Sequence, residues 1–331
     1  MAGRRQKKSG RRSYAWRYRG RIVACVFVEV IIICALVIMI GWNKGVKEWF
    51  EQFEQPVLKE VDISGINSPN AILMQARGGK ILGEINGEAQ IYPASMTKIM
   101  TVILGIENFD NLDEKITLTD EMFTGLYEQD ATQAGFQPGE EVRVIDLLYG
   151  AMLPSGAECC IALADTISGS EADFAELMNK KARKLGMENT HFCDSTGLHN
   201  PDHYSTVKDI AVLMKYCIKN DTFREIVETS RHSTGVTNIH PDGITYYSTM
   251  FKNLSAPTVT GGKILGGKTG YTSEAGHCLV SFAEIEGREY IFVSAGASGA
   301  DGNTIPHIQD AVTVYNRVGA AIEAKMNDNN K

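Results

Sequence analysis

The sequence predicts an α+β fold in which an antiparallel sheet is flanked by helices, carries an inserted and mostly helical lobe, and is preceded by one N-terminal transmembrane helix. Three observations support this prediction. Two short apolar runs near residue 70 have the pattern of a strand hairpin, helical periodicity dominates from about 108 to 220, and strand character returns after residue 260. Strands at both ends of the body with helices between them indicate a single sheet carrying a helical insertion.

The N-terminal 42 residues predict a membrane anchor. Residues 1–21 carry nine Lys and Arg side chains and no acidic one, and residues 22–42 form an apolar run of about the ~20 residues that a spanning helix needs. The positive-inside rule places the basic segment in the cytoplasm and the body outside. We therefore expect a single-pass protein of the cell membrane, with a cleaved signal peptide as the alternative interpretation of residues 22–42.

Composition excludes some classes of function for the body. The formal charge of the 331-residue chain is −7, but 24 basic and 40 acidic side chains remain once residues 1–21 are set aside. No nucleic-acid partner is therefore expected.

Five of the seven cysteines follow the apolar run, and an odd number with a vicinal pair does not form a disulfide framework. We interpret them as small core residues.

The remaining elements follow in chain order. Residues 43–66 are expected to be a stalk and linker, 67–326 the folded domain and 327–331 a polar tail. Apolar runs at 71–76 and 80–84 predict the hairpin, and a helix is expected to begin at Ser95. The later segments are three strands and a closing helix, at 263–269, 278–284, 290–295 and 307–325.

The first chemistry-bearing motif is the stretch 92–100, Tyr-Pro-Ala-Ser-Met-Thr-Lys-Ile-Met. Ser95 and Lys98 are three residues apart, so on a helix they share a face, and a deprotonated lysine could take the proton of the serine hydroxyl. Ser205 and Lys208 repeat the spacing before another apolar run. Either serine could instead be a helix N-cap, so the tetrapeptide alone does not decide between them.

Two further motifs complete an ordered set. Ser155 follows Pro154 and precedes an apolar helical run, which by itself is also typical of an N-cap. Lys268, Thr269 and Gly270 lie at the end of a predicted strand, where a cation, a hydroxyl and a residue without a side chain would suit an anionic ligand.

Three longer segments resemble the low-molecular-mass penicillin-binding proteins, specifically serine-type D-alanyl-D-alanine carboxypeptidases. These segments are 92–100, 146–156 and 267–276, and the stretches 195–198 and 203–206 are similar to the same family. The resemblance covers roughly residues 67–325 and implies a β-lactamase/DD-peptidase-like fold. It identifies Ser95 as the serine of the family motif. Ser205 is then a decoy, a serine that matches the tetrapeptide alone.

The resemblance also implies roles. Ser95 would be the nucleophile that forms an acyl-enzyme, Lys98 would accept its proton, and Ser155 would relay a proton to the leaving amine. Lys268, Thr269, Gly270 and Tyr271 would bind the substrate, with the Ser95 and Tyr271 N–H groups forming the oxyanion hole. The implied partners are peptidoglycan stem peptides ending in D-Ala-D-Ala, with β-lactams as covalent inhibitors, and no metal or cofactor is implied.

The sequence departs from the family pattern at Ala157, where the second motif of the family has asparagine. The β-rich C-terminal domain of many relatives is also not expected, and the N-terminal helix would replace their C-terminal anchor. A catalytically weak sensor of penicillin or wall peptides is therefore an alternative function, as is a serine β-lactamase, although no convincing Glu-x-x-x-Asn deacylation element lies between Ser155 and Lys268. A zinc peptidase using His199 and His203 lacks the His-Glu-x-x-His arrangement.

Overall fold

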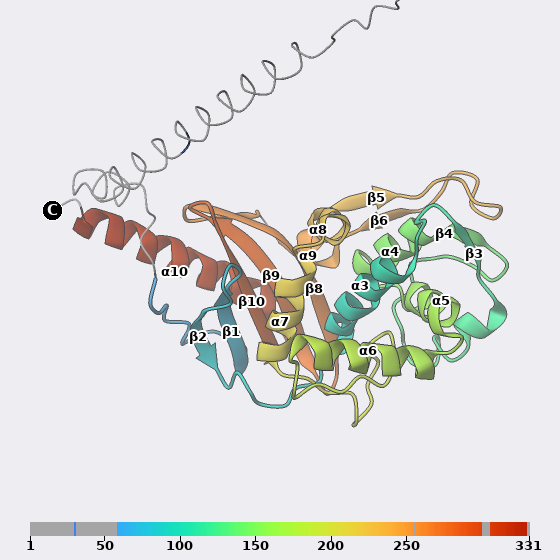
Figure 1. Ribbon diagram of the computed structural model, residues 1–331, viewed down its shortest axis with the longest axis horizontal. Coiled ribbons are helices and arrows are strands. Elements are labelled where there is room, and N and C mark those ends of the chain that lie inside the picture. Colours follow the sequence, from blue (N-terminus) through green and yellow to red (C-terminus); the bar gives the residue numbers. More distant parts are fainter. Residues whose placement is uncertain (1–29, 31–57, 255, 300–304, 330–331) are drawn as a thin grey trace, which may run out of the picture. The chain divides into compact units, whose positions relative to one another are not determined.

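The computed structural model describes residue 30 and residues 58–254, 256–299 and 305–329 (Figure 1). Apart from Val30, the expected span at 22–42 lies outside the described residues. Within the described ranges, no helix has both the length and the apolar character needed to cross a bilayer. The domain begins earlier than the predicted boundary at 67, because Leu58, Val61 and Ile63 are buried in its core and the Val61 N–H donates to the Leu82 carbonyl.

The centre of the domain is a six-stranded antiparallel sheet with the strand order β2-β1-β10-β9-β8-β7. Its strands are β1 (Asn70–Gln75), β2 (Ile81–Ile85), β7 (Thr258–Val259), β8 (Gly262–Thr272), β9 (Gly276–Ile285) and β10 (Arg288–Ala297). The N-terminal hairpin thus pairs with the C-terminal meander through β1 and β10. This arrangement confirms the predicted antiparallel sheet, with the three late strands longer than expected.

Both faces of the sheet are buried. Along β1, Ile72 and Met74 pack into one hydrophobic cluster, while Ala71 and Leu73 pack into a second cluster on the other face. A strand presents successive side chains to opposite faces, so an unbroken apolar run is what a sheet covered on both sides requires.

The inserted lobe supplies the helices that cover one face. Figure 1 shows them on the opposite side of the sheet from α10. The α-helices after residue 58 are α3 (Lys98–Asn108), α4 (Val144–Met152), α5 (Ala157–Ser168), α6 (Glu171–Leu185), α7 (Val207–Cys217), α8 (Asp221–Glu228), α9 (Thr249–Asn253) and α10 (Pro306–Asn329). Two short antiparallel ribbons are also present. One pairs β3 (Lys115–Thr117) with β4 (Glu141–Arg143), and the other pairs β5 (Arg231–Ser233) with β6 (Thr245–Tyr247).

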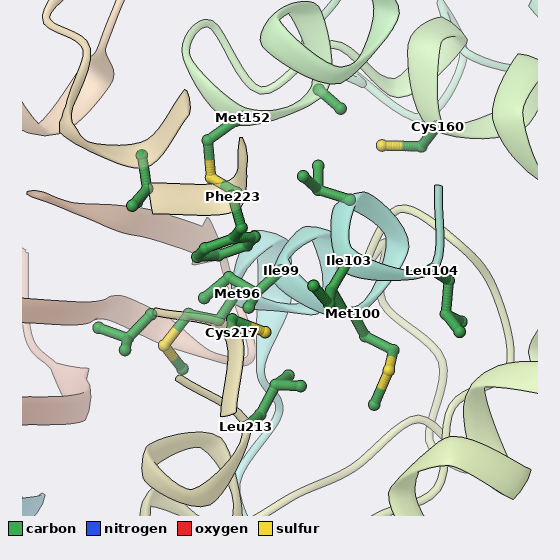
Figure 2. Packing of buried hydrophobic residues seen from close by; sticks show 14 of the residues in the cluster. Met96, Ile99, Met100, Ile103, Leu104, Met152, Cys160, Leu213, Cys217 and Phe223 are labelled. Atoms are coloured by element: carbon green, nitrogen blue, oxygen red, sulfur yellow. The ribbon is translucent and has the colours of Figure 1, made fainter. Parts of the chain in front are cut away.

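Helix α3 lies in the core of this lobe. Every residue from Lys98 to Gly105 is buried, and Figure 2 shows its Ile99, Met100 and Ile103 among side chains from several neighbouring elements. A helix that is apolar all round must be enclosed by other elements. The residue that begins α3 is therefore held in place by packing on every side.

Helix α10 covers the opposite face of the sheet. Val314, Tyr315 and Val318 are fully buried there, in the cluster that also contains Leu73 and Phe292. The helix runs from Pro306 to Asn329, so the predicted helix at 307–325 is confirmed but extends into the residues expected to form the polar tail from 327. The polar residues of that segment do not end the helix.

Candidate active site

The predicted nucleophile lies on a tight turn at the edge of α3. The structure places Ser95 in a 3-10 turn, Ala94–Thr97, and α3 begins only at Lys98. The predicted helix start at Ser95 is therefore wrong by three residues. The turn that carries Ser95 begins at Ala94, which adopts a left-handed conformation with φ of 46°. In a 3-10 turn, side chains three residues apart lie directly above one another, so the spacing still brings the two side chains together.

Lys98 contacts Ser95 and a second element. Its Nζ lies 3.1 Å from the Ser95 Oγ and donates a 2.6 Å hydrogen bond to the Thr196 carbonyl. The lysine is 3% exposed, whereas Ser95 is half-buried and open to solvent. A hydroxyl beside a buried amine, with access from outside, has the geometry of an activated nucleophile.

A second serine–lysine pair faces the first. The Lys268 Nζ donates to the Ser155 Oγ at 3.0 Å and to the Thr269 carbonyl at 2.9 Å. Ser155 does not cap a helix: its φ is 75°, and the N-cap residue of α5 is Gly156. A non-glycine residue in this region is strained, and such strain persists where the surrounding structure holds it and is common at active sites.

The two amines also interact electrostatically. Burial lowers the pKa of Lys268 well below its ordinary value, and the positive charge of Lys98 lowers it further. Lys268 is 1% exposed, so the free amine is favoured until an anion enters. A site of this kind attracts a carboxylate, because the carboxylate supplies the counter-charge with which the buried amine can hold a proton.

Strand β8 forms one wall of the site. The Thr269 hydroxyl lies 2.8 Å from the Thr249 hydroxyl on α9, and Tyr271 is 59% exposed with its ring against His277. A Cβ on Gly270 would lie 2.9 Å from the Ser95 nitrogen and 3.3 Å from the Pro93 carbonyl oxygen. Glycine is required there because the strand backbone passes so close to the turn that carries Ser95.

The loop at 194–197 is the part of the site that sequence reasoning did not assign. Asp194 Oδ1 accepts hydrogen bonds from the Thr196 N–H, the Thr196 hydroxyl and the Gly197 N–H, at 2.6 to 2.7 Å. Gly197 has φ of 82°, and a Cβ there would meet the Ala94 carbonyl oxygen at 1.9 Å. In the sequence, the stretch 195–198 shows only a family likeness, and Gly197 is the residue type that indicates a close approach.

Ala157 is the first residue of α5 and is 1% exposed. Its N–H donates to the Thr132 carbonyl at 2.8 Å, while the next residue, Glu158, is buried and accepts from the Ala134 and Gly135 N–H groups. Hydrogen bonds from the first turn of α5 thus connect the Ser155 turn to residues 132–135. The Ala157 side chain is a methyl group at the position where the family has an asparagine amide.

The competing residues have structural roles. Ser205 is fully buried, with its hydroxyl 2.8 Å from that of Thr190, and the cap of α7 is Thr206. His203 contacts Thr97 and Asp194, whereas His199 packs edge-on against Tyr92. The structure does not bring these histidines together at one ligand. In the described ranges, no three His, Cys, Asp or Glu side chains are grouped to hold a metal ion.

The five described cysteines are free thiols. Cys159, Cys160, Cys217 and Cys278 are buried, and Cys193 is half-buried. Burial raises the pKa of the Cys160 and Cys278 thiols to about 12, so they are inert protonated thiols. The four buried cysteines are core residues, as predicted, whereas Cys193 belongs to neither hydrophobic cluster and the prediction is wrong for it.

Comparison with known proteins gives consistent matches. The D-alanyl-D-alanine carboxypeptidase family matches residues 57–299. The chain is 35% identical over 233 residues to the D-alanyl-D-alanine carboxypeptidase DacF of Bacillus subtilis, covering 69% of this chain and 57% of DacF. It is 33% identical over 261 residues to DacC of Escherichia coli, covering 72% of this chain and 58% of DacC. The chain thus spans little more than half the length of these curated relatives.

Solved structures agree with the sequence matches. The crystal structure of the Streptomyces K15 DD-transpeptidase superposes with a TM-score of 0.69 at 29% identity, covering 79% of this chain and 100% of that one. The D-alanyl-D-alanine carboxypeptidase of Mycobacterium tuberculosis H37Rv has a TM-score of 0.69 at 21% identity, covering 81% and 96%, and shows a likeness of fold. On its sequence and its fold, the chain belongs to the D-alanyl-D-alanine carboxypeptidase family.

Proposed function

We propose that this protein is a serine D,D-carboxypeptidase that removes the terminal D-alanine from peptidoglycan stem peptides and is acylated by penicillins. The observation that carries the proposal is the pair of serine–lysine contacts, 3.1 Å between Lys98 and Ser95 and 3.0 Å between Lys268 and Ser155. Family membership supports the same reading.

Acylation uses the first pair. The hydrogen bond to the Thr196 carbonyl orients the Lys98 amine, so that a deprotonated Nζ accepts the Ser95 proton as Oγ attacks the carbonyl between the two D-alanines. The backbone N–H groups of Ser95 and Tyr271 stabilise the developing oxyanion. The C–N bond then breaks, and the leaving amine takes a proton through Ser155.

Substrate orientation uses the second pair. The terminal carboxylate of the substrate binds Lys268 and Thr269, with Gly270 allowing the peptide to lie along β8. Water then attacks the ester on Ser95 and releases the shortened peptide, with a lysine amine accepting the proton of the water. These roles need only groups that the chain itself supplies.

A labelled penicillin tests the assignment. Reaction with the protein, followed by digestion and mass spectrometry, is expected to place one adduct on Ser95, and Ser95→Ala should abolish it. Ser205→Ala, which removes the buried decoy hydroxyl, is the matched control and should keep the label. An adduct on Ser205 would refute the assignment.

Turnover separates the enzyme from the alternatives. Release of D-alanine from a D-Ala-D-Ala peptide supports the carboxypeptidase, whereas a stable adduct without any release supports the penicillin or wall-peptide sensor that Ala157 favours. Rapid hydrolysis of the penicillin adduct itself would identify a β-lactamase.

We further propose that residues 22–42 anchor the protein in the cell membrane with the catalytic domain outside. The basic segment and the apolar run support this topology. Protease added to intact protoplasts is expected to remove the domain, while a cytoplasmic control protein stays intact. Protected full-length protein would contradict the topology, and a soluble form beginning near residue 43 would favour the cleaved signal peptide.

A further inference from the structure

A buried aspartate–histidine pair lies behind the first motif. His203 is 2% exposed, and its Nδ1 lies 3.0 Å from the Asp194 Oδ2. Burial raises the pKa of Asp194, but hydrogen bonds from His203, Thr196 and Gly197 lower it more, to about 2. The carboxylate is therefore ionised at any working pH, and it accepts a hydrogen bond from His203 when Nδ1 carries the proton. The Cys193 N–H, 3.2 Å from the same nitrogen, competes for Nδ1 in the other tautomer.

The pair reaches the motif by two routes. The His203 Nε2 lies 2.9 Å from the hydroxyl of Thr97, the residue just before Lys98. The other oxygen of Asp194 holds the N–H groups of Thr196 and Gly197, and the carbonyl of Thr196 accepts from Lys98. One carboxylate thus fixes both the turn that precedes the lysine and the oxygen that its amine faces.

Other contacts fix the same loop to the lobe. The Ser195 carbonyl accepts from the Thr101 hydroxyl of α3 at 2.6 Å, and the Ser195 hydroxyl donates to the half-buried Glu171 of α6 at 2.5 Å. The loop is therefore attached to α3 and α6 through Ser195, the residue before the one whose carbonyl faces Lys98. Asp194 is the residue that fixes the peptide plane of Thr196 itself.

We propose that Asp194 and His203 are positioning residues for Lys98, acting by fixing the Thr196 carbonyl so that the amine points at Ser95. This inference rests on the proposed function, since it assigns Lys98 the role of proton acceptor. Neither residue touches the substrate. A group held about 1 Å out of place can cost on the order of 10²-fold in rate.

Acylation by penicillin under single-turnover conditions measures this role, because the limiting rate and the noncovalent dissociation constant are obtained separately. Asp194→Ala is expected to slow the limiting rate on the order of 10²-fold, with the dissociation constant unchanged. In a Lys98→Ala background the same substitution should add less than about twofold, because residues that act through one another are not additive.

Replacing His203 gives a rescue test. His203→Asn keeps a side-chain N–H for Asp194, and should acylate about tenfold faster than His203→Ala, the difference that one hydrogen bond to a charged group makes. His191→Asn is the matched control, because His191 bonds the Asp202 carbonyl and has no contact with residues 95–98. Its acylation rate should equal that of the native protein.

The outcomes are separable. Three results would each overturn the inference. The first is a full further loss of the limiting acylation rate when Asp194→Ala is added to Lys98→Ala, and the second is an effect of Asp194→Ala on the dissociation constant alone. The third is an equal acylation rate for His203→Asn and His203→Ala. If Asp194→Ala does not fold, Asp194→Asn carries the same test with a side chain of equal size. Failure of the native protein to form an adduct on Ser95 would instead overturn the proposed function.

Discussion

Replacing Lys98 by alanine is expected to lower the rate of Ser95 acylation by roughly 10²–10⁴-fold, the range that a positioned general base contributes. The amine lies 3.1 Å from the hydroxyl that it would deprotonate. Lys98 is the basic side chain that the described structure places in hydrogen-bond contact with Ser95. Ser95 would then attack as a neutral hydroxyl, which is a weak nucleophile.

Lys98→Arg distinguishes a role of Lys98 as a base from a role of its positive charge alone. The guanidinium keeps a positive charge but cannot give up a proton at working pH, so we expect the arginine variant to be nearly as slow as Lys98→Ala. Single-turnover acylation with a labelled penicillin measures both variants, and Lys208→Ala on the decoy motif is the control. An arginine variant within tenfold of the native rate would show that Lys98 acts as a charge and not as a base.

Short-range sequence patterns predicted the parts of this site that depend on spacing. Ser95 and Lys98 are three residues apart in either type of helix, so the contact survives the error in the helix start. The hairpin and the late strands followed from apolar runs bounded by glycine, because such runs specify a strand whatever its partner. The order of the strands, with β1 beside β10, depends on contacts across the whole chain.

Other parts of the site gave no local signal. The Thr196 carbonyl is 98 residues from Lys98, and a backbone oxygen has no residue type by which a sequence could reveal it. The left-handed conformations of Ala94 and Ser155 occur at residues that rarely adopt them, and tertiary contacts impose them. Ser205 looked like a cap because it precedes an apolar run, but the hydroxyl that reaches the Asp209 N–H belongs to Thr206.

Lys268→Met is expected to reduce activity and increase stability at the same time. Methionine has a similar length and no charge, so it removes the cation that would bind the substrate carboxylate. A hydrogen bond to a charged group is worth about 1.5–3 kcal/mol, which predicts a loss of roughly 10- to 150-fold in kcat/KM on a D-Ala-D-Ala peptide. Burying an amine without a counter-charge is costly, and removing that cost should add ~1–2 kcal/mol to the free energy of unfolding.

The stability gain should depend on pH in a defined direction. The pKa of Lys268 is lowered in the folded protein, so between that pKa and ~10.4, its unfolded value, the unfolded state binds one more proton. The reduction in the free energy of unfolding that this lysine causes is therefore greatest below its folded pKa, and it disappears as the pH rises toward ~10.4. Lys268→Met should exceed the native protein in Tm most at low pH, and the two should converge in alkaline buffer.

Thermal melts of the two proteins across this pH range, together with Lys263→Met, measure the effect. Lys263 lies on the same strand but is exposed, so its replacement should change neither Tm nor kcat/KM, and it controls for the loss of one positive charge. A gain of ~1–2 kcal/mol corresponds to roughly 2–8 °C in a domain of this size. If Lys268→Met melts below the native protein at every pH, the contacts of Lys268 with Ser155 and Thr269 outweigh the cost of its burial, and the lysine stabilises the site that it serves.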